Sequence, residues 1–130
     1  MSYRRRAKIN GLKAETKAAE YLTSFFNPAN IEFINDIADF YVSGKYIEVK
    51  SCQAWQKDTS HSKNRRRGRF VLYKNQHEFL LKNDGYYLFL LKTSKGIFLR
   101  LMKAKDVPAV FDRNDRCLLV WTKVIEEVVA

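Results

Sequence analysis

Apolar residues recur at helical spacing over the first part of the chain. Spaced at about 100° per residue, they form one stripe made of Ile9, Leu12, Ala19, Leu22 and Phe26. The pattern predicts a helix over residues 9–26, ended by Asn27-Pro28.

Short apolar runs follow this helix and predict strands over residues 31–34, 37–42 and 45–50. Ser43-Gly44 is a turn dipeptide, so the last two runs predict an antiparallel hairpin with Val42 opposite Lys45. The same register sets Asp39 opposite Glu48, with their Cβ atoms roughly 5 Å apart.

Alternation along the second strand of this hairpin places Lys50 on the face of Glu48, about 7 Å along the chain. The opposite face is expected to be apolar and to contain Ala38, Phe40, Val42, Ile47 and Val49. Two facing carboxylates repel each other unless a proton or a cation holds them together, so this hairpin is a candidate metal site.

The remaining pattern predicts a mixed α/β domain. We expect an extended piece over 70–73, a helix capped by Asn75 and ending at 83–85, and a hairpin of 86–92 with 97–102. Residues 103–107 fit a short helical turn, and 117–121 fit either a strand or the start of a terminal helix. Residues 51–69 read as a basic loop long enough to be mobile.

The length of 130 residues and the apolar content of 46% fit one domain, residues 1–130, with a core of its own. A net charge of +10 indicates an anionic partner, although charge alone does not separate DNA from RNA or an acidic membrane. The positive charge gathers in a basic arm over residues 1–8 and in the 51–69 loop. The candidate phosphate-binding residues are Arg4, Arg5, Arg6, Lys57, Lys63, Arg65, Arg66, Arg67 and Arg69.

The 51–69 loop has two interpretations. It could be a solubilising insertion, or it could bind nucleic acid, with Trp55 stacking on an unpaired base. We favour binding, because an aromatic residue accompanies the arginines. His61, a lone loop histidine, is given no role.

Cys52 and Cys117 are the only cysteines, and no paired-cysteine motif or secretory segment is present. We therefore expect a reduced, intracellular protein of the cytoplasm or nucleoid. The longest apolar run, residues 86–91, is far too short to span a membrane.

A third carboxylate comes from the first predicted helix. On the helical wheel Glu15 falls inside the apolar stripe, where a charge needs a partner, whereas Glu20 falls at its edge. Glu15 could pair with Lys50, or it could join Asp39 and Glu48 around a hard cation such as Mg²⁺ or Mn²⁺. Such a cluster beside basic segments suits phosphodiester hydrolysis, with Lys50 orienting or deprotonating the attacking water or stabilising the phosphate.

At these residues the chain resembles the PD-(D/E)xK nuclease superfamily, and within it the archaeal Holliday junction resolvases. Gly11-Leu-Lys-Ala-Glu15 resembles the Gly-x-x-x-Glu of the resolvase first helix, and Ile47-Glu48-Val49-Lys50-Ser51 resembles the Glu-x-Lys-Ser strand. Asp39 is similar to the motif aspartate, preceded here by Ala38 instead of proline. The segment before Asp39 is short and lacks the serine-bearing loop of many junction resolvases.

The resemblance implies a restriction-endonuclease-like core with a mixed central β-sheet flanked by helices. It implies Glu15, Asp39, Glu48 and the Val49 carbonyl as metal ligands, with Lys50 as the catalytic lysine. Gln76 is placed like a glutamine of resolvases and related exonucleases, although a polar residue on an exposed helix face would look the same.

Two hypotheses follow. The first is a Mg²⁺-dependent endodeoxyribonuclease, with Mn²⁺ able to substitute, that acts as a homodimer on branched DNA in recombination or repair. The second is a non-catalytic nucleic-acid-binding module, or a nuclease subunit that needs a partner, on the same fold.

Overall fold

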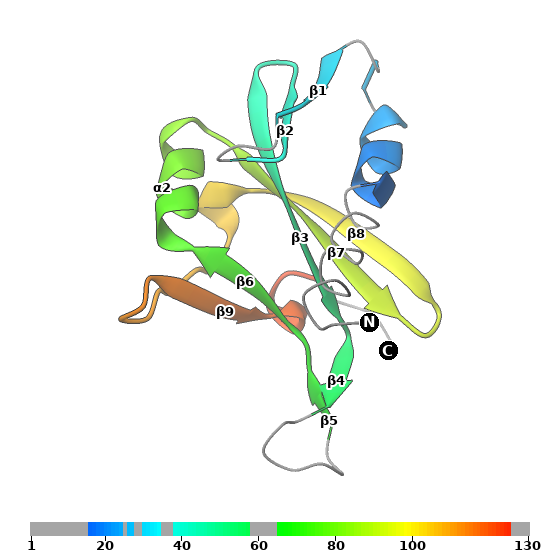
Figure 1. Cartoon of the computed structure of the whole chain (residues 1–130), viewed down its shortest axis with the longest axis vertical. Coiled ribbons are helices and arrows are strands. Elements are labelled where there is room, and N and C mark those ends of the chain that lie inside the picture. Colours follow the sequence, from blue (N-terminus) through cyan, green and yellow to red (C-terminus); the bar gives the residue numbers. More distant parts are fainter. Residues whose placement is uncertain (1–15, 25, 28–29, 35–37, 58–64, 126–130) are drawn as a thin grey trace, which may run out of the picture.

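A five-stranded mixed sheet forms the centre of the molecule (Figure 1). The structure is a computed structural model that describes residues 16–24, 26–27, 30–34, 38–57 and 65–125. The strand order is β1-β2-β3-β7-β8, and only β3 and β7 run parallel. The strands are β1 (Ile31–Phe33), β2 (Phe40–Val42), β3 (Lys45–Gln53), β7 (Tyr86–Thr93) and β8 (Gly96–Lys103). The predicted mixed sheet is confirmed.

The β2–β3 hairpin has the register that the sequence predicts. Val42 pairs with Lys45, and Phe40 pairs with Ile47. Ser43 and Gly44 both have positive φ, at 48° and 87°. A two-residue turn of this hand matches the twist of the two strands and fixes their register.

Two small sheets flank the central one. The β4–β5 ribbon joins β4 (Trp55–Lys57) to β5 (Arg65–Arg67), and β6 (Arg69–Tyr73) pairs with β9 (Arg116–Val120). The prediction of a loop over 51–69 was therefore wrong for its described parts, since β3 continues to Gln53 and the ribbon follows. β4 and β5 carry few apolar residues, so their sequence shows no core-facing alternation. The segment 117–121 is mainly strand.

Helices lie on both faces of the central sheet. Residues 16–23 are helical, three residues short of the predicted end at 26. Helix α2 (Lys74–Lys82) begins after Tyr73, so Asn75 lies inside the helix and is not its cap. The 3-10 turns η2 (Ala104–Asp106) and η3 (Trp121–Lys123) complete the elements. No helix among these described segments is long and apolar enough to cross a membrane.

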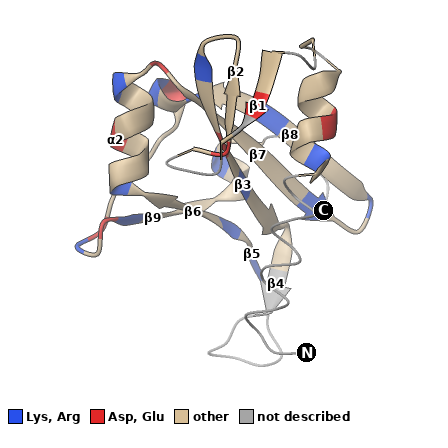
Figure 2. Ribbon diagram, turned by 45° about the horizontal axis from the view of Figure 1, so that its top comes forward, with Lys and Arg blue, Asp and Glu red and all other residues tan. Residues whose placement is uncertain are grey.

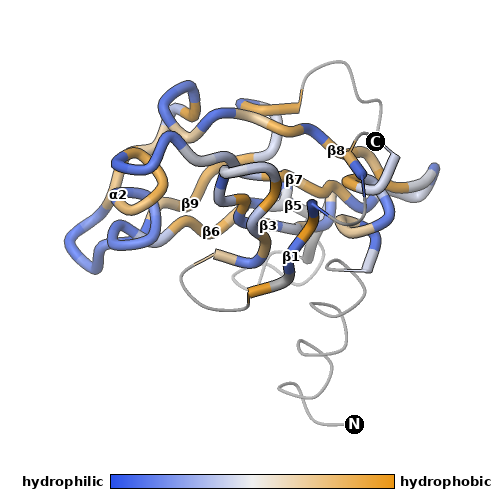
Figure 3. The backbone as a smooth tube through the Cα atoms, turned by 90° about the horizontal axis from the view of Figure 1, so that it is seen from above, coloured by the Kyte–Doolittle hydropathy of each residue, from blue (hydrophilic) through white to orange (hydrophobic). Residues whose placement is uncertain are grey.

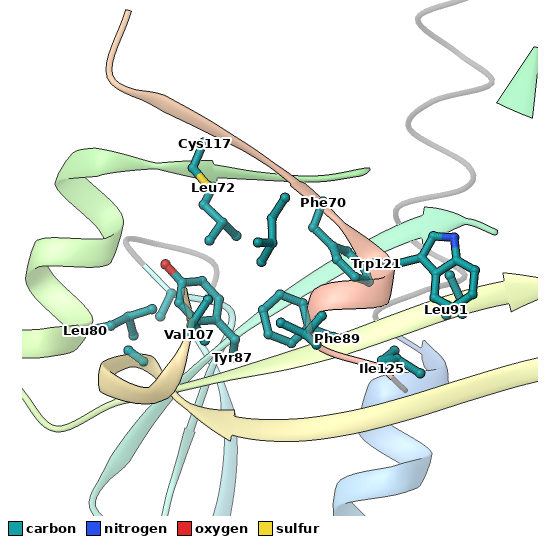
Figure 4. Packing of buried hydrophobic residues seen from close by; sticks show 14 of the residues in the cluster. Phe70, Leu72, Leu80, Tyr87, Phe89, Leu91, Val107, Cys117, Trp121 and Ile125 are labelled. Carbon is teal, nitrogen blue, oxygen red and sulfur yellow. The ribbon is translucent and has the colours of Figure 1, made fainter. Parts of the chain in front are cut away.

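The core has two layers, one on each face of the central sheet. On one face, the 16–23 helix packs Ala18 and Leu22 against Phe40, Ile47 and Leu88. The larger layer on the other face, shown close up in Figure 4, contains Phe70, Leu72, Leu80, Tyr87, Phe89, Leu91, Val107, Cys117, Trp121 and Ile125. Figure 3 shows the hydrophobic stretches of β6, β7 and β9 inside a margin of hydrophilic loops.

One residue of the predicted apolar face belongs to the other layer. Phe40, Val42 and Ile47 pack in the smaller layer as expected, but Ala38 packs in the larger one. β2 begins only at Phe40, so the alternation does not extend back to Ala38. Cys52 also packs against the larger layer, and both cysteines are free thiols.

Candidate active site

Asp39 is held at the start of the β2–β3 hairpin by main-chain contacts. Its own N–H donates to the Ile47 carbonyl at 3.2 Å, continuing the hairpin ladder. Its side-chain Oδ2 accepts the N–H of Val49 at 2.8 Å. The carboxylate is therefore fixed next to the stretch of β3 that carries Glu48, as the predicted register requires.

Glu48 is a buried acid, with 5% of its surface exposed. Burial, and then a hydrogen bond with the Asp39 carboxyl, raises its pKa to about 9 from an ordinary value of 4.5. Lys50 and the Val49 N–H oppose the shift but do not overcome it. Without a cation, Glu48 therefore keeps its proton at neutral pH.

Lys50 lies on the same face of β3, where alternation places it. Its Nζ is 3.8 Å from Glu48 Oε2, which is an ion-pair distance but longer than a hydrogen bond. Burial lowers the Lys50 pKa, although the neighbouring acids Glu48 and Asp39 pull it upward. A lysine with a lowered pKa gives up its proton more readily than an exposed lysine.

Sequence reasoning missed Tyr73 as a neighbour of the site. It ends β6, is 47% exposed, and places its ring 5.0 Å from Lys50 Nζ in a cation–π contact. The segments are 23 residues apart in the chain, so local periodicity carries no trace of the contact.

Sequence reasoning also missed Tyr87 and His77 as neighbours of the site on the side of Glu48. Tyr87 on β7 pairs with Glu48 in the parallel ladder, and its hydroxyl is 2.9 Å from His77 Nδ1 on α2. Burial and the nearby Glu48 carboxylate raise the Tyr87 pKa. A hydroxyl in the apolar run 86–91 and a histidine on the buried side of α2 were the available signals.

The described donors suit a hard cation. Asp39, just before β2, and Glu48 on β3 offer carboxylate oxygens, and Mg²⁺ and Mn²⁺ prefer oxygen ligands and need few from the protein. Two neighbouring carboxyls, one of them buried, are also stabilised by a proton or a cation between them. No group of three His, Cys, Asp or Glu side chains gathers within the described part of the chain. Glu15, the predicted third acid, lies outside it.

The other predicted site residues are distributed as follows. Gln76 lies on α2, three residues after Tyr73, with its Oε1 buried. Arg66 and Arg67 are exposed on β5, Arg69 is half-buried on β6, and basic residues along these strands are visible in Figure 2. For Lys57 and Arg65 the structure gives the strand position only. Arg4, Arg5, Arg6 and Lys63 lie outside the described residues.

Comparison with known proteins agrees with this geometry. A model of the PD-(D/E)XK nuclease superfamily domain matches residues 1–124. The chain belongs to the PD-(D/E)XK nuclease superfamily, and its mixed sheet flanked by helices is the restriction-endonuclease-like α/β fold. Nucleases of this superfamily generally use divalent metal ions. A search of curated proteins found no match.

Proposed function

We propose that this protein is a metal-dependent endonuclease that hydrolyses phosphodiester bonds in DNA. The observation that carries the proposal is the grouping of two acids and a lysine at one hairpin of a chain from a nuclease superfamily. Asp39 Oδ2 accepts the N–H of Val49, the neighbour of Glu48, at 2.8 Å, and Lys50 Nζ lies 3.8 Å from Glu48 Oε2. A buried carboxyl such as Glu48 beside a second carboxyl costs stability, and such perturbed groups concentrate at functional sites.

Each residue has a chemical task in this proposal. Asp39 and Glu48 would hold the cation, joined by the Val49 carbonyl and Glu15 as the superfamily resemblance implies. The bound cation supplies charge stabilisation at the phosphate and a water of lowered pKa. The Val49 N–H keeps the Asp39 carboxylate in place. Lys50, with its pKa lowered by burial, can take the proton of the attacking water or neutralise the phosphate.

The substrate and the assembly are the finer parts of the proposal. We infer that Mg²⁺ is the working ion, and that the substrate is branched, junction-like DNA of recombination or repair. A homodimer would supply two active sites to such a symmetric substrate. The resemblance to junction resolvases and the net charge of +10 support these assignments.

A cleavage assay tests the proposal. Purified protein is incubated with linear, flapped and four-way DNA, with Mg²⁺, Mn²⁺ or EDTA. We expect metal-dependent cleavage by the wild type, fastest on four-way DNA, and at least a hundredfold less by Asp39→Ala. Glu32→Ala, which removes an exposed acid on β1, should cleave normally. Wild-type protein that cuts nothing beyond the Asp39→Ala level would overturn the enzyme assignment.

One observation favours a second candidate, a nucleic-acid-binding subunit that needs a partner for activity. Arg66 and Arg67 on β5 are exposed, and such arginines can bind phosphate without any catalytic centre. This candidate predicts that calorimetry detects no Mg²⁺ binding and that Asp39→Ala combined with Glu48→Ala leaves DNA affinity unchanged. Mg²⁺ binding that disappears in the double variant would exclude it.

A further inference from the structure

The β4–β5 ribbon projects beyond the end of the central sheet (Figure 1). Trp55 pairs with Arg67, and Gln56 pairs with Arg66. Because paired residues of an antiparallel ladder share a face, Trp55 and Arg67 lie on one face of the ribbon and Arg66 lies on the other. Both faces therefore carry an arginine, and both arginines are exposed.

The face with Trp55 is organised by a cation–π contact. Arg67 Cζ lies 5.4 Å from the centroid of the Trp55 ring, and 38% of the Trp55 surface remains exposed. The contact places the guanidinium over the indole ring while Arg67 remains exposed. An arginine ordered in this way loses less entropy when it binds a phosphate or a base edge.

The base of the ribbon is firmly attached to the core. The Ala54 carbonyl accepts two hydrogen bonds, from the Trp121 indole N–H at 2.8 Å and from the Gly68 N–H at 3.0 Å. Gly68, between β5 and β6, lies so close to the end of β3 that a Cβ atom on it would be 1.8 Å from the Gln53 carbonyl oxygen. Trp121 is itself buried in the larger core layer. The ribbon therefore keeps a set direction relative to the sheet.

The same strand connects the ribbon with the active site. β3 carries Lys50 and ends at Gln53, and Trp55 starts β4 two residues later. Fully extended, five residues span about 17 Å, and the bend at Ala54 shortens this slightly. Along duplex DNA this length corresponds to about five base pairs at about 3.4 Å each.

We propose that the β4–β5 ribbon enters the major groove of duplex DNA about five base pairs from the bond that is cut. Arginines on both faces fit a groove with a phosphate wall on each side, whereas a ribbon lying flat on a surface would need only one basic face. The major groove of B-form DNA is about 12 Å wide and admits a two-stranded ribbon, but that of an RNA duplex is too narrow. This inference rests on the proposed function, because it places the duplex relative to Lys50.

Binding measurements on the full chain test the ribbon without requiring cleavage. The Asp39→Asn protein in EDTA is titrated with a 40-base-pair DNA duplex and with an RNA duplex of the same sequence. Adding Arg66→Ala and Arg67→Ala should weaken DNA binding at least tenfold. It should also reduce the slope of log K against log salt by about 2, as expected for two lost phosphate contacts. The charge-matched control, Lys95→Ala with Arg113→Ala, removes two exposed cations outside the ribbon and should change affinity less than threefold.

Two further arms test the groove and the distance. The RNA duplex should bind more weakly than DNA, and the ribbon substitutions should change its affinity less. The second arm uses four-way DNA whose arms are cut to three base pairs, too short to reach the ribbon. The protein with both ribbon arginines should bind this DNA no more tightly than the protein with Arg66→Ala and Arg67→Ala.

Equal losses for the ribbon and control variants, equal losses on RNA and DNA, or indifference to arm length would each overturn the ribbon proposal. A chain that binds as expected but never cleaves would overturn the proposed function and the distance to the cut bond, but not the binding of the ribbon in the groove.

Discussion

At the scale of single residues, Glu48 is the group of the site whose negative charge is least favourable. It is a buried carboxyl beside a second carboxyl, and its ammonium neighbour is too distant to hydrogen-bond it. Without metal, a proton on Glu48 removes its unfavourable negative charge. A bound cation would displace that proton and compensate the charge instead. Metal binding should therefore release a proton and strengthen as the pH approaches 9.

Glu48→Gln tests this account through stability. The Glu48 pKa is raised to about 9 when folded, from an ordinary 4.5, so its contribution is fully present below about pH 4.5 and is lost as the pH rises towards 9. Gln keeps the shape and does not titrate. Without metal, the variant should match the wild type at pH 4 and be more stable at pH 8, as measured by thermal unfolding.

Addition of Mg²⁺ should reverse that order at pH 8, because only the wild type gains the ligand's stabilisation. A variant that stays less stable than the wild type at both pH values without metal would contradict the raised pKa.

Tyr73 gives a prediction about Lys50. Its ring lies 5.0 Å from the ammonium, a contact worth about 0.5–2 kcal/mol. Tyr73→Leu removes the π face and should slow single-turnover cleavage by roughly two- to thirtyfold. Tyr73→Phe keeps the face and should stay near the wild-type rate. If both variants lose the same activity, the effect belongs to the Tyr73 hydroxyl, and the cation–π role of the ring is contradicted.

At the scale of elements, the sequence predicts the β2–β3 hairpin best and the β4–β5 ribbon worst. The hairpin has alternating apolar residues and a turn dipeptide, so its register and the placement of Glu48 and Lys50 follow from local rules. The ribbon consists mostly of polar and basic residues, and its pairing depends on a chain reversal that no apolar pattern marks. Ala38 was misplaced because alternation was extended beyond the strand.

The hairpin turn predicts a stabilising substitution. Ser43 has a φ of 48°, a region that asparagine tolerates better than serine, and Asn-Gly is the favoured pair for this turn. Ser43→Asn should stabilise the protein by about 0.5 kcal/mol, raising its melting temperature by roughly 2 °C. Cleavage should not change.

Gly44→Val provides the contrast for the turn. Gly44 has a φ of 87°, and nothing lies within 4 Å of where its Cβ would be. Valine should therefore destabilise the protein through backbone strain alone, by about 1–2 kcal/mol. A neutral Gly44→Val would show that the turn does not hold the register.

At the scale of the whole molecule, composition predicts the partner class but not where the partner binds. The net charge of +10 is a sum over the sequence, whereas the ribbon's direction depends on Trp121 and Ala54, 67 residues apart. For the same reason the acidic pair was predictable from one hairpin, but the aromatic neighbours of Lys50 and Glu48 were not. They reach the site only through the tertiary fold.

Salt dependence is the whole-molecule prediction. Four phosphate contacts would give a slope of log K against log salt of about −3.6, or roughly a hundredfold loss of affinity between 50 and 200 mM salt. The Asp39→Asn protein should show at least this loss on duplex DNA, measured by fluorescence anisotropy. Affinity that is insensitive to salt would contradict phosphate-dominated binding.

The central claim is that Asp39 and Glu48 hold a divalent cation. It is tested most directly by anomalous diffraction from crystals soaked in Mn²⁺ at pH 8. We predict a peak within about 2.3 Å of one oxygen of each carboxylate, absent from Asp39→Asn crystals grown in the same way. Crystals in which Mn²⁺ binds elsewhere, or nowhere, while the same protein still cleaves DNA with Mn²⁺, would contradict the account.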